Sequence, residues 1–356
     1  MKHLLLIDMD SYCKSVKLGK KTVGDNYPCY TIAEIGGHFS TFDEAKVLID
    51  SAIEVGVDAI KFQTLEAETV TTKNNFFDMK ATGHISQFEL LRKFEISKTV
   101  QKKIVEYTNQ FDTPIFSAPS HIKDLETIKE LELPIIKIGS DLSCHVPLLR
   151  EISSTGKPII LSTGMCTLEE VQTSVDNIID CGNCELILMH CVSNYPSNIN
   201  ELNLKAISTM KNKFHIPVGF SDHTIGIDST IASVVMGANI IERHFYDTRN
   251  TPSPDNIHAL TKDEFLNLIN KIRYIEKSFG DGIKLPTDSE KKNMLTNKVS
   301  IVAIKEIKKG TIITSEMIDI RRPGTGIQPK FFNQIIGRTA KETISKEQVL
   351  DWKSLI

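Results

Sequence analysis

Two histidines each follow a short apolar run, and each has an acidic residue within two positions in the sequence. His223 lies at the end of GFSDHT, and His244 lies in IERHF. Imidazole nitrogens suit manganese, zinc, iron or cobalt, with water or a substrate oxygen completing the coordination shell. If the fold brings the two side chains together, they could hold an open, exchangeable metal that serves catalysis. If it does not, they are two unrelated core histidines.

Two lysines lie inside apolar runs, Lys61 in AIKFQT and Lys137 in IIKIGS. A buried ammonium group costs free energy unless an anion pairs with it. We therefore expect both lysines to face an anion, although a neighbouring glutamate could also be their partner. Neutral donors are added by hydroxyl groups at the ends of the apolar runs, those of Ser140, Ser162 and Ser221. Ammonium and hydroxyl groups together could cradle a phosphate or a carboxylate.

One carboxylate, Glu34 in TIAEIGG, is the best isolated candidate for a general base. It could orient or deprotonate a water molecule. It could also pair with Lys61, and the two roles are compatible. The chain has no Walker sequence, so the anion is not held by a P-loop.

The elements that must position these residues follow a regular alternation. Apolar runs rich in Ile and Val alternate with longer amphipathic stretches such as FDEAKVLIDSAIEVG, and the runs are TIAEIGG, DAIKFQT, PIFSAPS, PIIKIGS, PIILSTG, LILMHCVSNYP, PVGFSDHT and NIIERHF. This pattern is typical of buried parallel strands in βαβ units, and eight of them predict a (β/α)8 TIM barrel. A doubly wound open sheet is the alternative, but no G-x-G-x-x-G follows the first strand.

The barrel turns the scattered polar residues into one site. Active sites of such barrels lie at the C-terminal ends of the strands. His223 and His244 end adjacent predicted strands, so they are expected to meet across the mouth. A polar insertion at 66–87 is expected to cover the site, because long loops between barrel elements often do so.

The chain divides into four predicted segments. Residues 1–30 are a β-rich lead-in that closes the bottom of the barrel, and Asp8 and Asp10 within it lack the further motifs of a second site. Residues 31–282 form the barrel, residues 283–296 a polar linker, and residues 297–356 a small β-rich domain. The last segment is about 60 residues long, a size at which a domain buries little core.

Composition excludes several functional classes. The 356 residues carry a net charge of −3, which argues against nucleic-acid or anionic-membrane partners. No apolar run is long enough for a membrane span, and the N-terminus lacks the features of a signal peptide. Seven irregularly spaced cysteines favour reduced thiols and a cytoplasmic location. The lone pair in CGNC, Cys181 and Cys184, is expected to flank a helix-to-strand turn rather than bind metal.

Several motifs, taken in order, resemble the sialic acid synthase family, which makes N-acetylneuraminate, legionaminate and pseudaminate. They are IAEIG, AIKFQT, KIGS, GKPIILSTGM, HCVSNYP, VGFSDHTIGI and IERHF. The tail, SIVAIKEIKKGTIIT to IIGRTAKE, resembles the antifreeze-like SAF domain of these enzymes. The resemblance implies condensation of phosphoenolpyruvate with the open-chain aldehyde of an N-acetylmannosamine-type sugar, with release of phosphate. It also implies a divalent metal, usually manganese, with magnesium or cobalt as alternatives.

The resemblance also assigns residues by motif. The metal would be held by His223 and His244, and Glu34, Lys61 and Lys137 would be catalytic. The phosphoenolpyruvate site would consist of Lys61, Lys137, Ser140, Ser162, Ser193 and Ser221. The sugar would lie near Gln63, Tyr195 and Asp255. Arg322, in RRPGTG, would reach from the tail into the partner's barrel, which implies a domain-swapped homodimer.

The loops that would face the sugar depart from the family pattern. The family usually has Asn-His-Asn-Gly after the first strand, whereas this chain has GGHFST at 36–41; SAPS replaces Ser-Thr-Pro-Phe, and PSPDN replaces Pro-Gly-Pro-Asp-His. The acceptor therefore stays open between N-acetylmannosamine, its 6-phosphate and a 2,4-diacetamido-trideoxy sugar. A 3-deoxy-ulosonate synthase is one alternative, which the tail domain disfavours. A non-catalytic sugar-binding homologue is another, which the retained Glu34, lysines, histidines and Arg322 disfavour.

Overall fold

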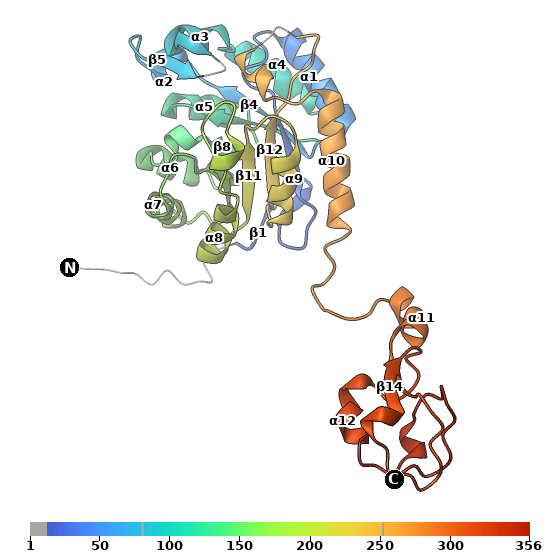
Figure 1. Ribbon diagram of the computed structural model, residues 1–356. Helices are drawn as coiled ribbons and strands as arrows, with labels where there is room; N and C mark the ends of the chain where they lie inside the picture. Colours follow the sequence, from blue (N-terminus) through green and yellow to red (C-terminus); the bar gives the residue numbers. More distant parts are fainter. Residues whose placement is uncertain (1–12, 80–81, 251–252) are drawn as a thin grey trace, which may run out of the picture. The chain divides into compact units, whose positions relative to one another are not determined.

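The computed structural model describes residues 13–79, 82–250 and 253–356. The chain forms two compact units, one ending at Phe279 and the other covering Gly280–Ile356 (Figure 1). Each unit has its own hydrophobic core and is described by itself. No helix in the described ranges is long and apolar enough to cross a membrane.

The first unit is a closed barrel of parallel strands. Its strands are β3 (Tyr30–Glu34), β4 (Ala59–Thr64), β7 (Ile115–Pro119), β8 (Ile136–Ile138), β9 (Ile159–Ser162), β10 (Leu186–Cys191), β11 (Val218–Asp222) and β12 (Ile240–His244). They pair in chain order, and β12 closes the ring on β3. The predicted barrel is confirmed, and the open doubly wound sheet is excluded.

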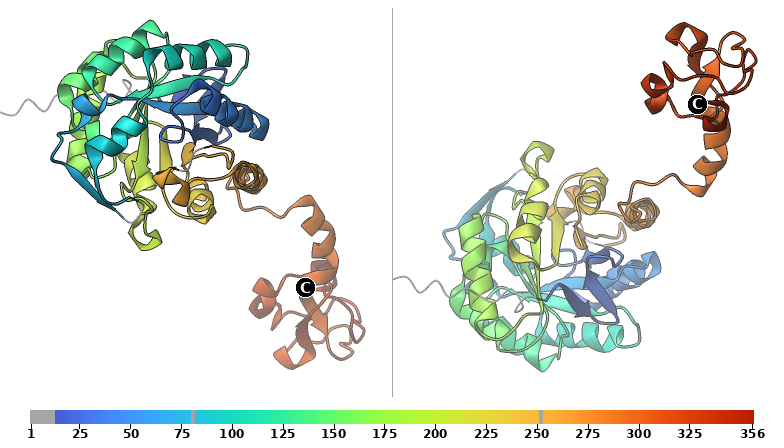
Figure 2. Two further views of the ribbon diagram at one scale, coloured as in Figure 1. Left: turned by 90° about the horizontal axis from the view of Figure 1, so that it is seen from above. Right: turned by 90° about the horizontal axis from the view of Figure 1, so that it is seen from below.

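One helix follows each barrel strand and packs its apolar face outside the ring (Figure 2). These helices are α1 (Phe42–Val55), α4 (Lys98–Thr108), α5 (Ile122–Glu130), α6 (Val146–Ser153), α7 (Leu168–Ile179), α8 (Lys205–Phe214), α9 (Asp228–Val235) and α10 (Lys262–Glu276). Several begin with a capping box, as Thr41 does with Glu44 at the start of α1. The cap satisfies backbone donors that the first helical turn leaves free, and so fixes where each helix begins.

A β-hairpin closes the barrel at the end away from the strands' C-termini. It consists of β1 (Ser15–Leu18) and β2 (Lys21–Gly24). Its side chains Val16, Leu18 and Val23 are buried against residues that fill the barrel interior, such as Phe116 and Ile160. Described residues 13–30 thus plug the bottom of the barrel, while Asp8 and Asp10 lie outside the described residues.

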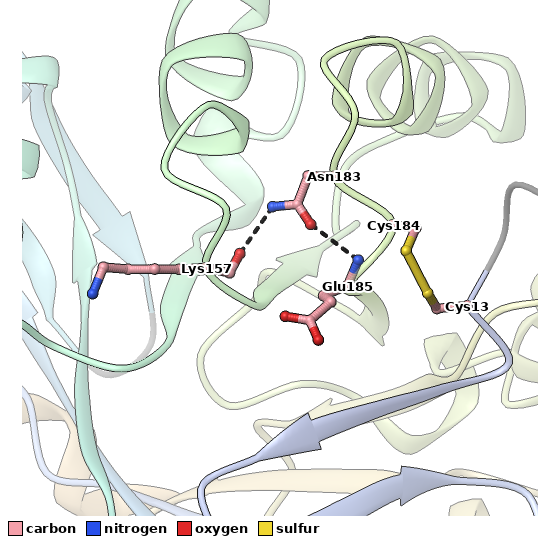
Figure 3. Close-up of a disulfide and its surroundings, with 5 residues drawn as sticks. All are labelled: Cys13, Lys157, Asn183, Cys184 and Glu185. Atoms are coloured by element: carbon pink, nitrogen blue, oxygen red, sulfur yellow. Dashed lines mark hydrogen bonds between the residues drawn. A yellow bond between two sulfur atoms is a disulfide. The ribbon is translucent and has the colours of Figure 1, made fainter.

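A disulfide between Cys13 and Cys184 ties this lead-in to the start of β10 (Figure 3). The expectation of reduced thiols throughout is therefore wrong for these two cysteines, because the fold brings their Cα atoms within 5.5 Å. The stretch CGNC is a turn between α7 and β10. Gly182 has a φ of +85°, and the Asn183 amide donates to the Lys157 carbonyl over 2.9 Å.

The insertion after β4 is more ordered than a plain loop. It contains α2 (Ala67–Val70), a hairpin of β5 (Phe76–Met79) and β6 (Gly83–Ser86), and α3 (Gln87–Lys93). Figure 1 shows these elements at the opposite end of the barrel from β1. They therefore lie at the mouth, where the strands' C-termini converge.

The second unit begins with part of the predicted linker, which is helical over α11 (Asp288–Asn297). Thr287 and Glu290 form a capping box that starts this helix. Beyond it, β13 (Ser300–Ala303) pairs with β14 (Ile318–Arg321), and a short helix, α12 (Phe332–Ile335), follows. Isoleucines dominate its core, including Ile301, Ile313 and Ile344. Pairing outside the two strands is limited to isolated bridges, so regular β structure is sparser than the sequence pattern suggests.

Candidate active site

A cavity of about 490 Å³ opens at the mouth of the barrel. It brings together most of the residues singled out in the sequence, and its lining includes Lys61, Gln63, Lys137, Ser140, Ser162, Ser193, Tyr195, Ser221, His223, His244 and Asp255. Glu34 lies directly behind this lining, against Lys61. Arg322 belongs to the second unit, so the barrel itself does not contain it.

A buried set of charges forms the floor of the cavity. The Lys61 ammonium contacts the Glu34 carboxylate and lies 3.6 Å from Oε1 of Glu242. The Lys137 Nζ lies 3.7 Å from the same Glu242 oxygen and donates to Ser162 Oγ over 2.6 Å. Glu242 thus connects both lysines, and its oxygen also accepts a hydrogen bond from a neighbouring serine, Ser221, over 3.1 Å.

Burial and charge shift the pKa values of these groups in opposite directions. Burial raises the pKa of Glu34, and Glu242 adds to the effect while Lys61 opposes it. Burial lowers the pKa of Lys137, which Glu242 offsets only in part. Burial also disfavours the charge on Lys61, but the two glutamates outweigh it and raise its pKa. A carboxyl group beside ammonium groups can accept a proton from a bound substrate or water and return it later in the reaction.

Four histidine rings gather on one side of the cavity. The ring centroids of His223 and His244 lie 5.6 Å apart, and His258 lies 4.8 Å from His244. His38, His244 and Asp255 offer ligand atoms that all lie within 4.8 Å of one another. The two predicted histidines are therefore neighbours, as the barrel requires, and they have further potential ligands beside them.

The donor atoms of this group are free to bind a cation. Buried ring nitrogens without a hydrogen-bond partner occur on His38, His244 and His258. His223 Nδ1 lies 3.1 Å from the Val192 carbonyl, an arrangement that leaves Nε2 for a ligand. Burial lowers the pKa of His223 and His38 to about 4, so both rings are neutral at pH 7, the form that binds metals. Neutral imidazoles and a carboxylate fit a divalent transition metal.

An ion pair beneath the histidines fixes the ends of their strands. The fully buried Arg243 pairs with Asp222 over 2.8 Å and donates to the carbonyls of Thr224 and His258. Asp222 and Arg243 immediately precede His223 and His244 in the chain. The pair therefore holds the two histidine-bearing strand ends at a fixed separation.

The outer wall of the cavity is apolar and comes from the insertion. Its side chains include Leu65, Val70, Phe77, Leu90, Leu91, Phe94 and Ile96. Among the described lining residues, Lys61 and Lys137 are the only lysines or arginines. The expectation that the insertion covers the site is confirmed, although the surface it turns inward is mostly apolar, with Thr82 and Gln87 as its polar members.

Several residues of the site were not predicted from the sequence. Glu242 was visible on its strand, two residues before His244, and alternate residues of a strand share a face. His38 lies on a loop that departs from the expected motif, and His258 follows a second such loop. Asp255, which was expected beside the sugar, lies together with His38 and His244. Cys191 lies at the end of β10 with its Sγ 3.0 Å from Ser140 Oγ. Loop positions carry no periodicity, so only the fold could reveal these neighbours.

Comparison with known proteins agrees with this geometry. The NeuB family model matches residues 48–284, and a SAF domain model matches residues 298–356. The chain belongs to the NeuB family. A sialic-acid-synthase resemblance and a SAF-domain tail are thus confirmed.

Relatives of this NeuB-family chain carry synthase names. The N,N'-diacetyllegionaminic acid synthase of Legionella pneumophila is 34% identical over 95% of this chain and 97% of its own length. The pseudaminic acid synthase of Campylobacter jejuni is 33% identical over 88% of this chain and 93% of its own length. The crystal structure of N-acetylneuraminic acid synthetase from Leptospira borgpetersenii, in complex with citrate, matches with a TM-score of 0.69 at 30% identity. The match covers 79% of this chain and 95% of that one.

Proposed function

We propose that this protein is a nonulosonic acid synthase. It would condense phosphoenolpyruvate with the aldehyde of an N-acetylated amino sugar and release phosphate, as a carbon–carbon bond-forming transferase. The observation that carries the proposal is one cavity in which a buried lysine pair faces a cluster of neutral imidazoles and a carboxylate. The first group suits a small polyanion, and the second suits a metal beside an aldehyde oxygen.

Phosphoenolpyruvate would lie over the floor of the cavity. Lys61 and Lys137 supply ammonium groups that already share the one carboxylate of Glu242. An incoming phosphate or carboxylate would give both ammonium groups a further anionic partner. The hydroxyl donors around it would be Ser140, Ser162, Ser193 and Ser221, all of which line the cavity.

The imidazoles would hold a divalent metal, which we propose to be manganese. His223 and His244 are the expected ligands, and His38 and Asp255 are close enough to His244 to join them. When bound, such an ion supplies Lewis-acid polarisation of the aldehyde oxygen. Asp222 and Arg243 act as positioning residues, because they fix the strand ends that carry the ligands.

The reaction balances with groups present in the cavity. C3 of phosphoenolpyruvate forms a bond to the aldehyde carbon, whose oxygen takes up a proton. Water adds at C2, and the C2–O bond to phosphate breaks, leaving a keto acid. Glu34 would take the proton of the attacking water or of a substrate hydroxyl, since its raised pKa suits proton transfer.

The acceptor sugar would lie between the metal cluster and the apolar wall. Gln63, which donates to Glu34 over 3.1 Å, would contact it, as would Tyr195 and Asp255. A wall of leucine and phenylalanine favours methyl and acetyl groups over a phosphate, which would find no lysine or arginine in the described lining beyond the two in the floor. We therefore propose an uncharged, deoxygenated and acylated amino sugar.

The SAF domain would complete the site from a second chain. Arg322 is exposed on its loop. By family resemblance, it would contact the acetamido group of the sugar bound in the partner's barrel. We propose a domain-swapped homodimer that works in the cytoplasm, where phosphoenolpyruvate is made.

The experiment is phosphate release from phosphoenolpyruvate with manganese across a panel of acceptors. The panel contains N-acetylmannosamine, its 6-phosphate, and 2,4-diacetamido-trideoxy sugars of different stereochemistry. Release with one acceptor, abolished by EDTA and restored by manganese, is the expected result. A sugar complex that forms without metal and without phosphate release would instead support a non-catalytic binding protein.

A further inference from the structure

Two thiols lie side by side on neighbouring loops, outside the lining of the cavity. Cys144 follows the short turn η2 (Ser140–Leu142), and Cys166 follows β9, just before α7. Their sulfur atoms are 3.8 Å apart, and the Ser143 hydroxyl lies 2.8 Å from the Cys166 sulfur. Cys144 is exposed and Cys166 is half-buried. A small oxidant from solution can therefore reach the pair, and neither sulfur must travel far to meet the other.

Both thiols belong to loops that carry cavity residues. The η2 loop supplies Ser140, and the loop after β9 begins at Ser162. The two loops are joined by a hydrogen bond from the Gly164 amide to Ser140 Oγ, 3.0 Å long. A Cβ atom at Gly164 would collide with Ser140 and Ser193. The two loops are therefore closely packed. A shift of either loop would also displace the hydroxyl groups of Ser140 and Ser193.

We propose that Cys144 and Cys166 are a redox-modifiable dithiol whose oxidation weakens phosphoenolpyruvate binding. Hydrogen peroxide would transfer one oxygen to the Cys144 thiolate, which gives a sulfenic acid, and its other oxygen would leave as water. The Cys166 sulfur would then attack the sulfenic sulfur and expel a second water as the S–S bond forms. The two thiols lose two electrons and two protons in total, and one peroxide becomes two waters.

The order of the two steps follows from the surroundings. Cys144 is the accessible member and reacts first. Burial raises the pKa of Cys166 to about 11, so Cys166 is mostly the protonated thiol and reacts more slowly with peroxide. Cys191 is buried in the cavity and Cys181 lies on the far turn beside the Cys13–Cys184 disulfide, so neither competes for this pairing.

The consequence for binding is geometric. A disulfide requires a sulfur separation of about 2.05 Å, so the two loops must approach by roughly 1–2 Å. Ser143 also loses its hydrogen bond to the Cys166 sulfur. Displacement of the Ser140 hydroxyl would misalign a hydrogen bond to an anion, and such a loss weakens affinity by about tenfold or more.

The test uses the full-length protein treated with a small excess of hydrogen peroxide and then alkylated. Peptide mapping without reduction detects the disulfide directly, and calorimetric titration measures phosphoenolpyruvate affinity. The proposal rests on the proposed phosphoenolpyruvate site. Neither readout needs turnover, and the peptide map reports the disulfide even if phosphoenolpyruvate does not bind, so the two failures can be told apart. Cys144→Ser and Cys166→Ser are the variants, and Cys181→Ser is the matched control.

In the wild type and in Cys181→Ser, we expect oxidation to give a cross-linked Cys144–Cys166 peptide. Affinity for phosphoenolpyruvate should fall about tenfold and recover when a reductant is added. Both effects should vanish in Cys144→Ser. The recovery of phosphoenolpyruvate affinity is also measured in Cys13→Ser. This variant lacks the Cys13–Cys184 disulfide, so reduction of that disulfide cannot explain the recovery. Absence of the cross-link, or an equal loss of affinity in Cys144→Ser, would overturn the proposal.

Discussion

Glu242 on β12 reaches Lys61 on β4 over 3.6 Å, although β3 stands between the two strands in the barrel. The same carboxylate oxygen lies 3.7 Å from Lys137 on the far side. Glu242 therefore faces both buried ammonium groups across the barrel axis, while Glu34 pairs with Lys61 alone. Its charge state governs how strongly the floor attracts an anion.

Glu242→Gln removes this shared counter-ion. We expect the free energy of unfolding to fall by about 3–5 kcal/mol, because the buried Lys137 loses its carboxylate partner and Lys61 keeps only Glu34. Phosphoenolpyruvate should raise the melting temperature of the variant by more than it raises that of the wild type, since its charges replace the lost carboxylate. Melting curves with and without phosphoenolpyruvate measure both effects. Glu126→Gln, the same change on the exposed face of α5, is the control, and equal behaviour of the two variants would refute the assignment.

Asp222→Asn breaks the buried pair with Arg243. Leaving that guanidinium unpaired should cost about 3–5 kcal/mol, or roughly 10 °C in melting temperature. Burial alone would raise the pKa of Asp222, but Arg243 and several hydroxyl groups outweigh burial and lower that pKa. A lowered folded-state pKa stabilises the protein above about pH 4, and this contribution disappears as the pH falls below that value.

The matched control is Asp112→Asn, which breaks an exposed pair with Lys20. Melting temperatures from pH 7 down to pH 3 should converge for wild type and Asp222→Asn as acid protonates the wild-type carboxylate. A constant difference across that range would contradict the role given to Asp222.

His244→Ala should weaken manganese binding by at least about 100-fold, because this ring adjoins every other candidate ligand. His38→Ala should weaken it by about tenfold if its unpartnered Nε2 joins the shell. Paramagnetic resonance of free manganese gives both affinities without any assay of turnover. His84→Ala, on the exposed hairpin strand β6, is the control. Unchanged affinity in His244→Ala would place the metal elsewhere.

Leu91→Lys places an ammonium group in the apolar wall. We expect this variant to lower the KM for a 6-phosphorylated acceptor by about tenfold while the KM for phosphoenolpyruvate stays within about twofold. The wild type should prefer a 6-deoxy acceptor over the 6-phosphate. Steady-state kinetics with both acceptors decide the point. A wild-type preference for the phosphate would show that its charge is recognised by a group outside this wall.

Mixed dimers test the contribution of Arg322. Arg322→Ala and His244→Ala should each be nearly inactive alone. Co-expressed in equal amounts, they should regain about a quarter of wild-type activity, because half of the dimers are mixed and each mixed dimer has one intact site. Double-tag purification of the mixed dimer allows the measurement. No recovery in the mixed dimer would mean that Arg322 acts in its own chain, and full activity of Arg322→Ala alone would mean that it has no role.

Much of the fold followed from the apolar pattern. Buried parallel strands such as IIKIGS and NIIERHF are near-continuous apolar runs, so their polar residues stood out as positions at the mouth. Lys61, Lys137, His223 and His244 could be placed for this reason. Parallel strands whose C-termini meet at one rim bring such residues together without further information.

The parts that could not be predicted depend on loops or on long-range pairing. His38 and His258 lie on segments without periodicity, and their closeness to His244 arises only when β12 closes on β3. The Cys13–Cys184 bridge joins residues 171 positions apart, which no spacing rule could select from seven cysteines. The inward-facing apolar side chains of the insertion could not be predicted, because the segment as a whole is polar.

The central claim is that phosphate leaves by cleavage of its bond to C2 after carbon–carbon bond formation. It is tested most directly by running the reaction in ¹⁸O-labelled water with manganese and the preferred acceptor. Mass spectrometry then gives the ¹⁸O content of both products. We predict a nine-carbon keto acid in equal amount to phosphate, with no ¹⁸O in the phosphate. Labelled phosphate, or phosphate without the nine-carbon acid, would contradict this mechanism and indicate hydrolysis at phosphorus.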